Sequence, residues 1–237
     1  MSENKFSLPD PQKAWDYENG FFLTASPDRL AKIIVHYELY KLIQNVHGAI
    51  VECGVFKGAS FVRWAMLKKI FNDHRQLIGF DTFGEYPETQ NEDDKSKRER
   101  FIQEAGDKSS DIDALLAILV RLDVAKEVLL CRGDICKRVP AVVKEEPEFQ
   151  HLQIALLHVD VDIYEPTVTI LDHLWPKVMP GGIMVLDDYG VFPGETRAVD
   201  EYFQQIPQEM YSGIQGFPFR KTPVYVKKTA EFYNLKK

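Results

Sequence analysis

Short apolar segments alternate with longer amphipathic segments along most of this chain. The apolar segments are predicted strands, at 49–51, 77–81, 127–131, 154–160 and 183–186. The amphipathic segments that follow them are predicted helices, at 60–72, 112–122, 140–144, 166–174 and 196–206. Strands this short and this apolar are typical of sheets that helices cover on both faces. The alternation therefore predicts an α/β domain with a doubly wound, mostly parallel sheet.

The first 47 residues do not follow this alternation, and we separate them, as an N-terminal arm and helix, from a domain expected over 48–237. Residues 1–25 are expected to form an irregular arm with scattered aromatic residues. Ser26 and Pro27 then indicate the start of a helix, with a capping hydroxyl and a first-turn proline. Its apolar positions fall mostly on one face: Leu30, Ile33, Ile34, Tyr37, Tyr40, Leu42 and Ile43. The arm could pack over the domain or reach a second copy in a homo-oligomer.

Two other segments depart from the repeating pattern. Residues 84–110 are polar and charge-rich, and they are too long for a simple turn. We expect a lid or a helical insert there, with a solvated surface excursion as the alternative. Near the C-terminus, 217–219 and 224–227 predict a final strand or strand pair.

Composition narrows the classes of partner. The net charge of −7 disfavours broad electrostatic attraction to nucleic acid. Three cysteines without a zinc-type spacing are typical of a reducing compartment, and Cys53 and Cys131 are expected to be buried thiols. The chain shows neither an apolar signal core nor an apolar run near the ~20 residues that cross a bilayer. We therefore expect a cytoplasmic protein that binds neither nucleic acid nor a membrane.

Glycines and an acid follow the first two predicted strands. Gly54 and Gly58 come directly after the first strand, where they would let backbone turn sharply and approach a ligand closely. The full dinucleotide fingerprint and the phosphate-loop ending are both missing. Asp81 ends the second strand, where doubly wound cofactor folds place an acid on ribose hydroxyls. Each feature alone is common, but together they favour an adenosine-type ligand.

Paired acids follow the fourth and fifth strands: Asp160 with Asp162, and Asp187 with Asp188. Adjacent parallel strands would bring these carboxylates together, and their mutual repulsion would raise their pKa values. A divalent cation removes that conflict, and oxygen-only ligation suits Mg²⁺, Mn²⁺ or Ca²⁺. The alternative is helix capping by Asp162 and Asp188. His158, inside the fourth strand, is expected to be a core residue.

Four separated segments resemble the macrocin O-methyltransferase (TylF-like) family: 51–58 (VECGVFKG), 79–83 (GFDTF), 158–167 (HVDVDIYEPT) and 180–189 (PGGIMVLDDY). The resemblance implies a Rossmann-like class I methyltransferase fold, S-adenosylmethionine as the methyl donor, a bound Mg²⁺, and a small-molecule acceptor hydroxyl on a deoxysugar or glycoside. By position it implies Asp160, Asp187 and Asp188 as metal ligands and Asp162 as the general base. The positions that match the cofactor cleft are Glu52, Gly54, Ser60, Asp81 and, on the adenine side, Asp134.

Other readings of the same residues remain open. A catechol-type metal-dependent O-methyltransferase would share the fold and the carboxylate triad. A non-catalytic cofactor-binding module would keep Glu52, Gly54 and Asp81 but would have no use for four converging acids. An NAD-dependent oxidoreductase is disfavoured because the glycine fingerprint is incomplete.

Overall fold

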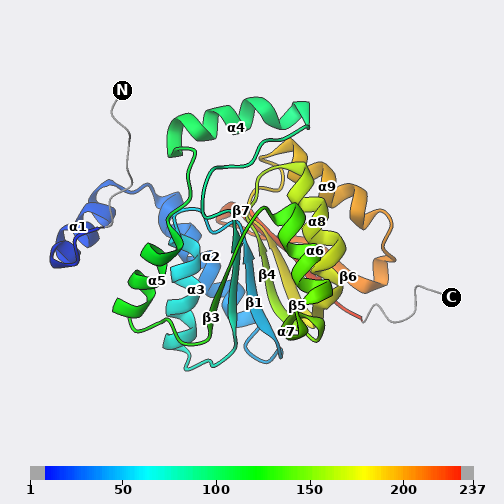
Figure 1. The fold of residues 1–237 in the computed structure, drawn as a ribbon, viewed down its shortest axis with the longest axis horizontal. Helices are drawn as coiled ribbons and strands as arrows, with labels where there is room; N and C mark the ends of the chain where they lie inside the picture. The colour runs from blue at the N-terminus through cyan, green and yellow to red at the C-terminus, as the bar shows by residue number, and fades with distance from the viewer. Residues whose placement is uncertain (1–8, 231–237) are drawn as a thin grey trace.

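A computed structural model of the chain describes residues 9–230, so the expected arm lies partly outside the described residues. Its centre is a seven-stranded sheet in the order β3-β2-β1-β4-β5-β7-β6 (Figure 1). Strands β1 to β5 are parallel, and β7 runs antiparallel to both β5 and β6. The bounds are β1 Ala49–Cys53, β2 Leu77–Asp81, β3 Val128–Arg132, β4 Ile154–Val159, β5 Val178–Leu186, β6 Tyr211–Phe217 and β7 Arg220–Lys228. The predicted doubly wound, mostly parallel sheet is confirmed.

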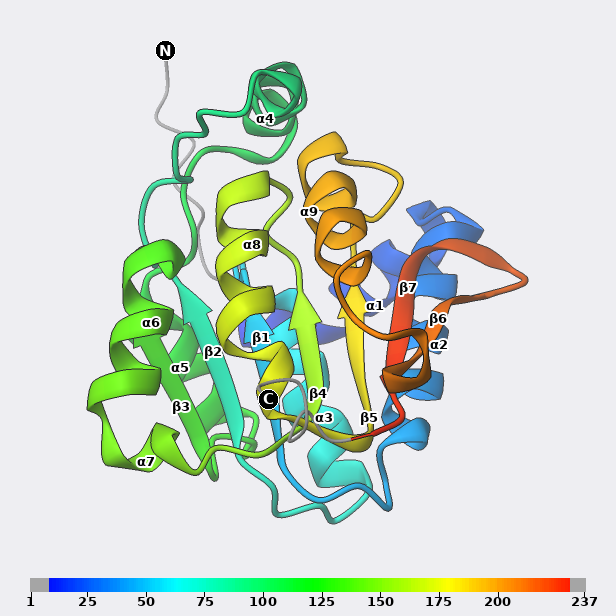
Figure 2. The ribbon, with the colours of Figure 1, turned by 90° about the vertical axis from the view of Figure 1, so that its right-hand side faces the viewer.

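Helices cover both faces of this sheet (Figures 1 and 2). One face carries α2 Pro27–Leu42, α3 Ala59–Ile70 and α5 Ile112–Arg121, and the other carries α6 Ile135–Glu145, α8 Tyr164–His173 and α9 Pro193–Phe203. Successive strand residues point to opposite faces, so Ile50 and Leu156 pack under the first group and Val51 and Leu157 under the second. Short helical segments complete the chain: α7 Pro147–Gln150, η1 Pro11–Lys13, η2 Trp175–Lys177 and η3 Gln208–Met210.

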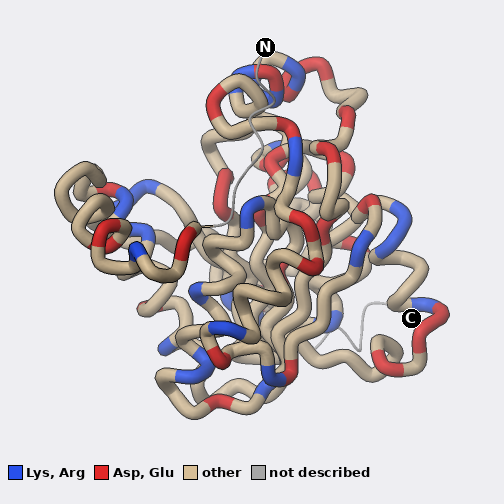
Figure 3. Tube along the Cα trace, turned by 60° about the vertical axis from the view of Figure 1, so that its left-hand side comes forward, with Lys and Arg blue, Asp and Glu red and all other residues tan. Residues whose placement is uncertain are grey.

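The N-terminal arm is helical where the sequence suggested irregular backbone. Helix α1 spans Ala14–Thr24 and follows a short turn that Asp10 caps by accepting a hydrogen bond from the Gln12 backbone N–H at 3.0 Å. None of its residues is buried, and it projects from the body of the molecule (Figures 1 and 3). The sequence pattern did not predict this helix, because its aromatic residues do not form a single buried face.

Helix α2 begins after Ser26 as predicted, but the Ser26 side chain makes no capping hydrogen bond. The buried face is Val35, His36, Leu39, Tyr40 and Ile43. Leu30, Ile34, Tyr37 and Leu42, which we placed on the apolar face, are each 40–42% exposed. Helix α2 lies on the sheet beside α3 and β7 and shares a core with β1 and β4. This position in the fold determines which of its faces is buried.

Two element boundaries also differ from expectation. Helix α6 runs over Ile135–Glu145 and accommodates Pro140, where we expected a short helix at 140–144. Strand β5 begins at Val178, before the start that we predicted at residue 183, so the Pro-Gly-Gly segment lies inside the strand. Its pairing with β4 shifts register between Ile154 and Leu156, and that irregularity accommodates the extra residues of β5.

The insert at 84–110 contains helix α4, Glu92–Ala105, which lies above the carboxyl ends of the parallel strands (Figures 1 and 2). Asp94 holds its first turn in place. This buried carboxylate accepts hydrogen bonds from the backbone N–H of Tyr164 at 3.0 Å and of Gly194 at 2.7 Å, in the first turns of α8 and α9. The insert is therefore tied to two helix N-termini, where a carboxylate is favoured. Its movement as a lid stays a prediction.

Candidate active site

A cavity of about 640 Å³ opens at the carboxyl edge of the parallel strands, beneath the insert. Its walls include most of the residues that the sequence singled out: Gly54, Ser60, Asp81, Asp134, Asp160, Asp162, Asp187 and Asp188. Glu52 is the exception, because its side chain is fully buried behind the wall. The order of the strands spreads these residues across the cavity, from Asp134 after β3 to Asp187 and Asp188 after β5.

Gly54 allows the turn after β1 to lie directly against the turn after β4. Its φ is +91°, a left-handed conformation that favours glycine. A Cβ atom at this position would lie 1.7 Å from the Asp160 carbonyl oxygen. The glycine therefore brings the expected cofactor loop next to the first of the paired acids, and any larger residue would push the two apart.

Asp81 organises the same loop. Its Oδ2 accepts hydrogen bonds from the backbone N–H groups of Val55 and Phe56, both at 2.9 Å, and its Oδ1 accepts from Phe83 at 2.7 Å. Asp134 caps helix α6 by accepting from the Cys136 N–H at 3.0 Å. Both acids also face the cavity, so their structural roles leave them in contact with whatever binds there.

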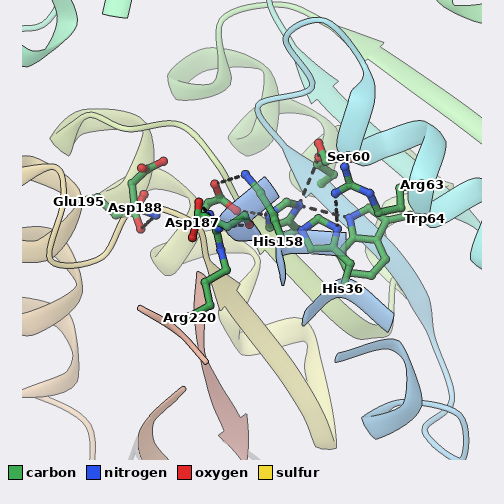
Figure 4. Close-up of polar contacts among 12 residues, drawn as sticks. His36, Ser60, Arg63, Trp64, His158, Asp187, Asp188, Glu195 and Arg220 are labelled. Carbon is green, nitrogen blue, oxygen red and sulfur yellow. Dashed lines mark hydrogen bonds and ion pairs between the residues drawn. The ribbon is translucent and has the colours of Figure 1, made fainter. Parts of the chain in front are cut away.

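Beneath the wall lies a chain of buried polar groups (Figure 4). The Ser60 hydroxyl donates to Glu52 Oε1, which lies 3.2 Å from His158 Nδ1. The other imidazole nitrogen, Nε2, lies 3.5 Å from Asp187 Oδ1. Burial lowers the pKa of His158, but the hydrogen bonds to Asp187 and Glu52 outweigh burial and raise it to about 10. His158 is thus a buried residue, as expected, that also orients one of the paired acids.

The paired acids converge as the strand order predicted. Asp160, Asp187 and Asp188 each offer a carboxylate oxygen within 4.8 Å of the others. Burial and the Asp187 charge raise the pKa of Asp160, and burial and the Asp162 charge raise that of Asp188. Burial also acts to raise the pKa of Asp187, but hydrogen bonds from His158 and the charge of Lys32 lower it well below its usual range. Crowded carboxylates of this kind fit a hard divalent cation.

Asp162 stands beside this triad in a strained backbone conformation, with φ at +65°. Its Oδ2 accepts a hydrogen bond from the Tyr86 hydroxyl at 2.8 Å. Burial and the Asp160 charge raise its pKa to about 6. Neither Asp162 nor Asp188 caps a helix through its side chain within residues 9–230, so the capping alternative does not account for them.

Three further residues belong to the site and were not predicted from the sequence. Lys32 on α2 places its Nζ 2.6 Å from Asp187 Oδ2. Tyr86 comes from the insert, and Glu195 from α9 accepts a hydrogen bond from the Asp188 N–H at 3.2 Å. Burial and the Asp188 charge raise the pKa of Glu195. No pattern along the chain marks these residues, because only the packing of α2, the insert and α9 over the strand ends brings them in.

The fold and the site together define the class: a Rossmann-like methyltransferase domain with a carboxylate cluster beside the cofactor edge. The model of the macrocin O-methyltransferase (TylF) family matches residues 28–214, and the chain belongs to this family. In the part of the chain that the structure describes, no helix combines the length and the apolar character needed to cross a membrane.

Two curated relatives are O-methyltransferases by name, and the name of the first specifies a rhamnosyl compound. The 8-demethyl-8-(2,3-dimethoxy-alpha-L-rhamnosyl)-tetracenomycin-C 4'-O-methyltransferase of Streptomyces olivaceus is 29% identical over 153 residues, which cover 63% of this chain and 56% of that protein. The mycinamicin III 3''-O-methyltransferase of Micromonospora griseorubida is 26% identical over 163 residues, 68% of this chain and 62% of that protein. The chain thus spans about three fifths of the length of these relatives.

Solved structures show the same fold. CalS11, a calicheamicin methyltransferase, aligns with a TM-score of 0.68 and 24% identity over 92% of this chain and 86% of its own. The O-methyltransferase NovP aligns with a TM-score of 0.67 and 23% identity, covering 86% of this chain and 80% of its own. These alignments cover a larger share of this chain than the curated matches do.

Proposed function

We propose that this chain is an Mg²⁺-dependent O-methyltransferase that transfers a methyl group from S-adenosylmethionine to a hydroxyl of a sugar or glycosylated small molecule. The observation that carries the proposal is the convergence of Asp160, Asp187 and Asp188 at one side of a cavity whose other side holds Gly54 and Asp81. Family membership and the relatives that methylate glycosides support the same conclusion.

The residues present fit both groups. Gly54, Ser60, Asp81 and Asp134 would hold the cofactor, with Glu52 supporting Ser60 from behind. Asp160, Asp187 and Asp188 would hold the metal, because their carboxylate oxygens converge within 4.8 Å of one another and burial with neighbouring carboxylate charge raises the pKa values of Asp160 and Asp188. Bound S-adenosylmethionine supplies an electrophilic methyl group, and bound Mg²⁺ lowers the pKa of a hydroxyl that it coordinates.

Asp162 is the proton acceptor in this proposal. Its Oδ2 accepts a hydrogen bond from the Tyr86 hydroxyl, and the same carboxylate takes the proton of the acceptor hydroxyl. A pKa of about 6 keeps most of the carboxylate ionised at neutral pH while it remains basic enough to receive a proton. Tyr86 orients the carboxylate and also ties the insert to the site. The insert then excludes water and shapes the acceptor pocket.

Helix α1 supports a homo-oligomer as the assembled state. An isolated helix of 11 residues is marginal in water, yet α1 buries no residue against its own chain. It exposes Trp15 at 75%, Phe22 at 62% and Leu23 at 84%, and α2 exposes its own apolar stripe. Together these surfaces present on the order of 800 Å², about one partner's share of a standard interface. Both surfaces belong to one chain, so an exchange of arms between two copies would cover both.

The proposed activity is tested by replacing Asp162. Asp162→Asn should leave S-adenosylhomocysteine binding by calorimetry unchanged and lower the methyl-transfer rate about 10²- to 10⁴-fold, the usual contribution of a general base. Wild-type turnover should require Mg²⁺ and stop in excess chelator. Wild-type activity in the variant would remove Asp162 from the base role. Turnover of catechols but not of sugar diols would favour the catechol-type alternative.

A further inference from the structure

One of the cationic side chains that line the cavity, Arg63, makes no ion pair with an acid among the described residues. Arg63 is on α3, one turn after Ser60, and its side chain lines the cavity. Its guanidinium Nη1 lies 3.0 Å from His36 Nδ1 (Figure 4). Within residues 9–230 it makes no ion pair, whereas Lys32, the neighbouring cation, is paired with Asp187.

The one contact of Arg63 is with a neutral group. Burial and the charge of His158 lower the pKa of His36 well below its usual range, so its imidazole is uncharged and accepts from Arg63. His36 is itself fixed by stacking on Trp64, with ring centroids 4.4 Å apart and planes within 5°. Burial also lowers the pKa of Arg63, although an arginine stays protonated in proteins. The charges of Glu52, Asp187 and Asp160 partly offset this burial. A largely buried guanidinium whose printed hydrogen-bond partner is neutral would gain further from an anion in direct contact.

The shape of the cofactor indicates which anion. A sulfonium sulfur carries three substituents, and in the proposed function the methyl group faces Asp162 and the metal ligands after β4 and β5. The adenosine then lies toward Asp81 after β2 and Asp134 after β3. The third substituent, the amino-acid tail, would then lie against the part of the cavity wall that the start of α3 forms. Ser60 and Arg63 are the polar side chains of α3 that line the cavity there.

We propose that Arg63 binds the carboxylate of the amino-acid tail of S-adenosylmethionine. A guanidinium offers five N–H donors in a planar fork that matches a carboxylate in two parallel hydrogen bonds. His36 accepts a hydrogen bond from one of these donors and so orients the guanidinium of Arg63. The other donors remain for the ligand. The inference rests on the proposed function, because it assumes that this cavity receives the methyl donor.

Two ligands distinguish binding through the amino-acid tail from binding through the rest of the cofactor. S-adenosylhomocysteine carries the tail, and 5'-methylthioadenosine has the same adenosine and thioether without it. Calorimetry on the full chain should show that Arg63→Gln weakens S-adenosylhomocysteine about 10- to 100-fold, the value of a charged hydrogen-bonded contact. The same variant should bind 5'-methylthioadenosine within about twofold of wild type, which also shows that the cavity is intact.

Arg29→Gln is the matched control, since Arg29 also lines the cavity but is exposed at its rim. It should bind both ligands as wild type does, and a selective loss of S-adenosylhomocysteine there would overturn the assignment to Arg63. An equal loss of both ligands in Arg63→Gln, or no loss of either, would also overturn it. If wild type binds neither ligand, the proposed function fails and this inference fails with it.

Discussion

The four aspartates of the site are alike in sequence but differ in their surroundings. Asp187 is held ionised by Lys32 and His158, while Asp160 and Asp188 have raised pKa values because burial and neighbouring charges disfavour ionisation. Asp162 lies between these extremes, with a pKa of about 6. Two cations, Lys32 and the protonated His158, are thus shared among carboxylates that could hold a third. Metal binding and the position of Lys32 should therefore be coupled.

Lys32→Met removes that cation and leaves its apolar stem. We expect the free protein to lose about 1–3 kcal/mol of stability, because Asp187 keeps a buried charge without its partner. Added Mg²⁺ should then raise the melting temperature of the variant more than that of wild type. Thermal unfolding with and without Mg²⁺ measures both effects. Equal metal-induced shifts in the two proteins would contradict this coupling.

Asp73 predicts a pH dependence of stability away from the site. Burial acts to raise its pKa, but the Tyr40 hydroxyl at 2.6 Å and Arg75 outweigh burial and lower the pKa below its usual value. A carboxyl with a lowered pKa stabilises the folded state at neutral pH, and the contribution is lost as pH falls through the folded pKa.

Asp73→Asn should therefore unfold in less urea than wild type at pH 7, by about 1–2 kcal/mol. The difference should shrink below about pH 4, where the Asp73 carboxyl of the unfolded wild-type chain begins to take up a proton. The other acids titrate in both proteins, so their contributions to the pH dependence of stability cancel in this comparison. A gap that stays constant from pH 7 to pH 3 would show that the Asp73 charge is not what stabilises this contact.

Elements far apart in the sequence are joined at the insert. Asp94 on α4 accepts from the first turns of α8 and α9, and Thr89 and Gln90 donate to Glu165 on α8. The insert is consequently fixed at the end near the acids.

Asp94→Ala should release the insert. The loss of its capping hydrogen bonds should cost about 1–3 kcal/mol and should speed proteolytic cleavage within 88–106. Gly194→Ala tests the same contact without removing the charge, because a Cβ there would lie 1.8 Å from Asp94 Oδ2. Asp93→Ala, which removes only an exposed ion pair to Arg197 on α9, should stay close to wild type. Identical cleavage patterns for the Asp94 and Asp93 variants would refute the tether.

At the scale of the whole molecule, the exposed helix α1 predicts self-association. Leu23→Glu places a charge on the proposed interface at a side chain that is 84% exposed in the single chain. Light scattering after size exclusion should show a dimer or larger assembly for wild type and a monomer for this variant. Val120→Glu, at an apolar residue 66% exposed on α5, should keep the wild-type mass. A monomeric wild type would leave α1 without its partner and end the proposal.

The alternation of short apolar and amphipathic segments determined the layers of this fold. Each strand pattern is local, and short apolar strands fit only a sheet with both faces covered. Topology then follows, because right-handed crossovers put the carboxyl ends of parallel strands at one edge. The positions of Asp81, Asp160, Asp187 and Asp188 at that edge could be read directly from the chain, and the structure places all four along one cavity.

Tertiary packing alone decided what surrounds those acids. Lys32, Arg63 and Tyr86 reach the cavity from α2, α3 and the insert, and whether a side chain points there depends on how each element lies across the sheet. Hydrophobic periodicity could not settle the buried face of α2, because apolar residues lie on both its sides. The interaction between the charged groups of the site depends on the distances between them. Those distances are set only when the chain has folded.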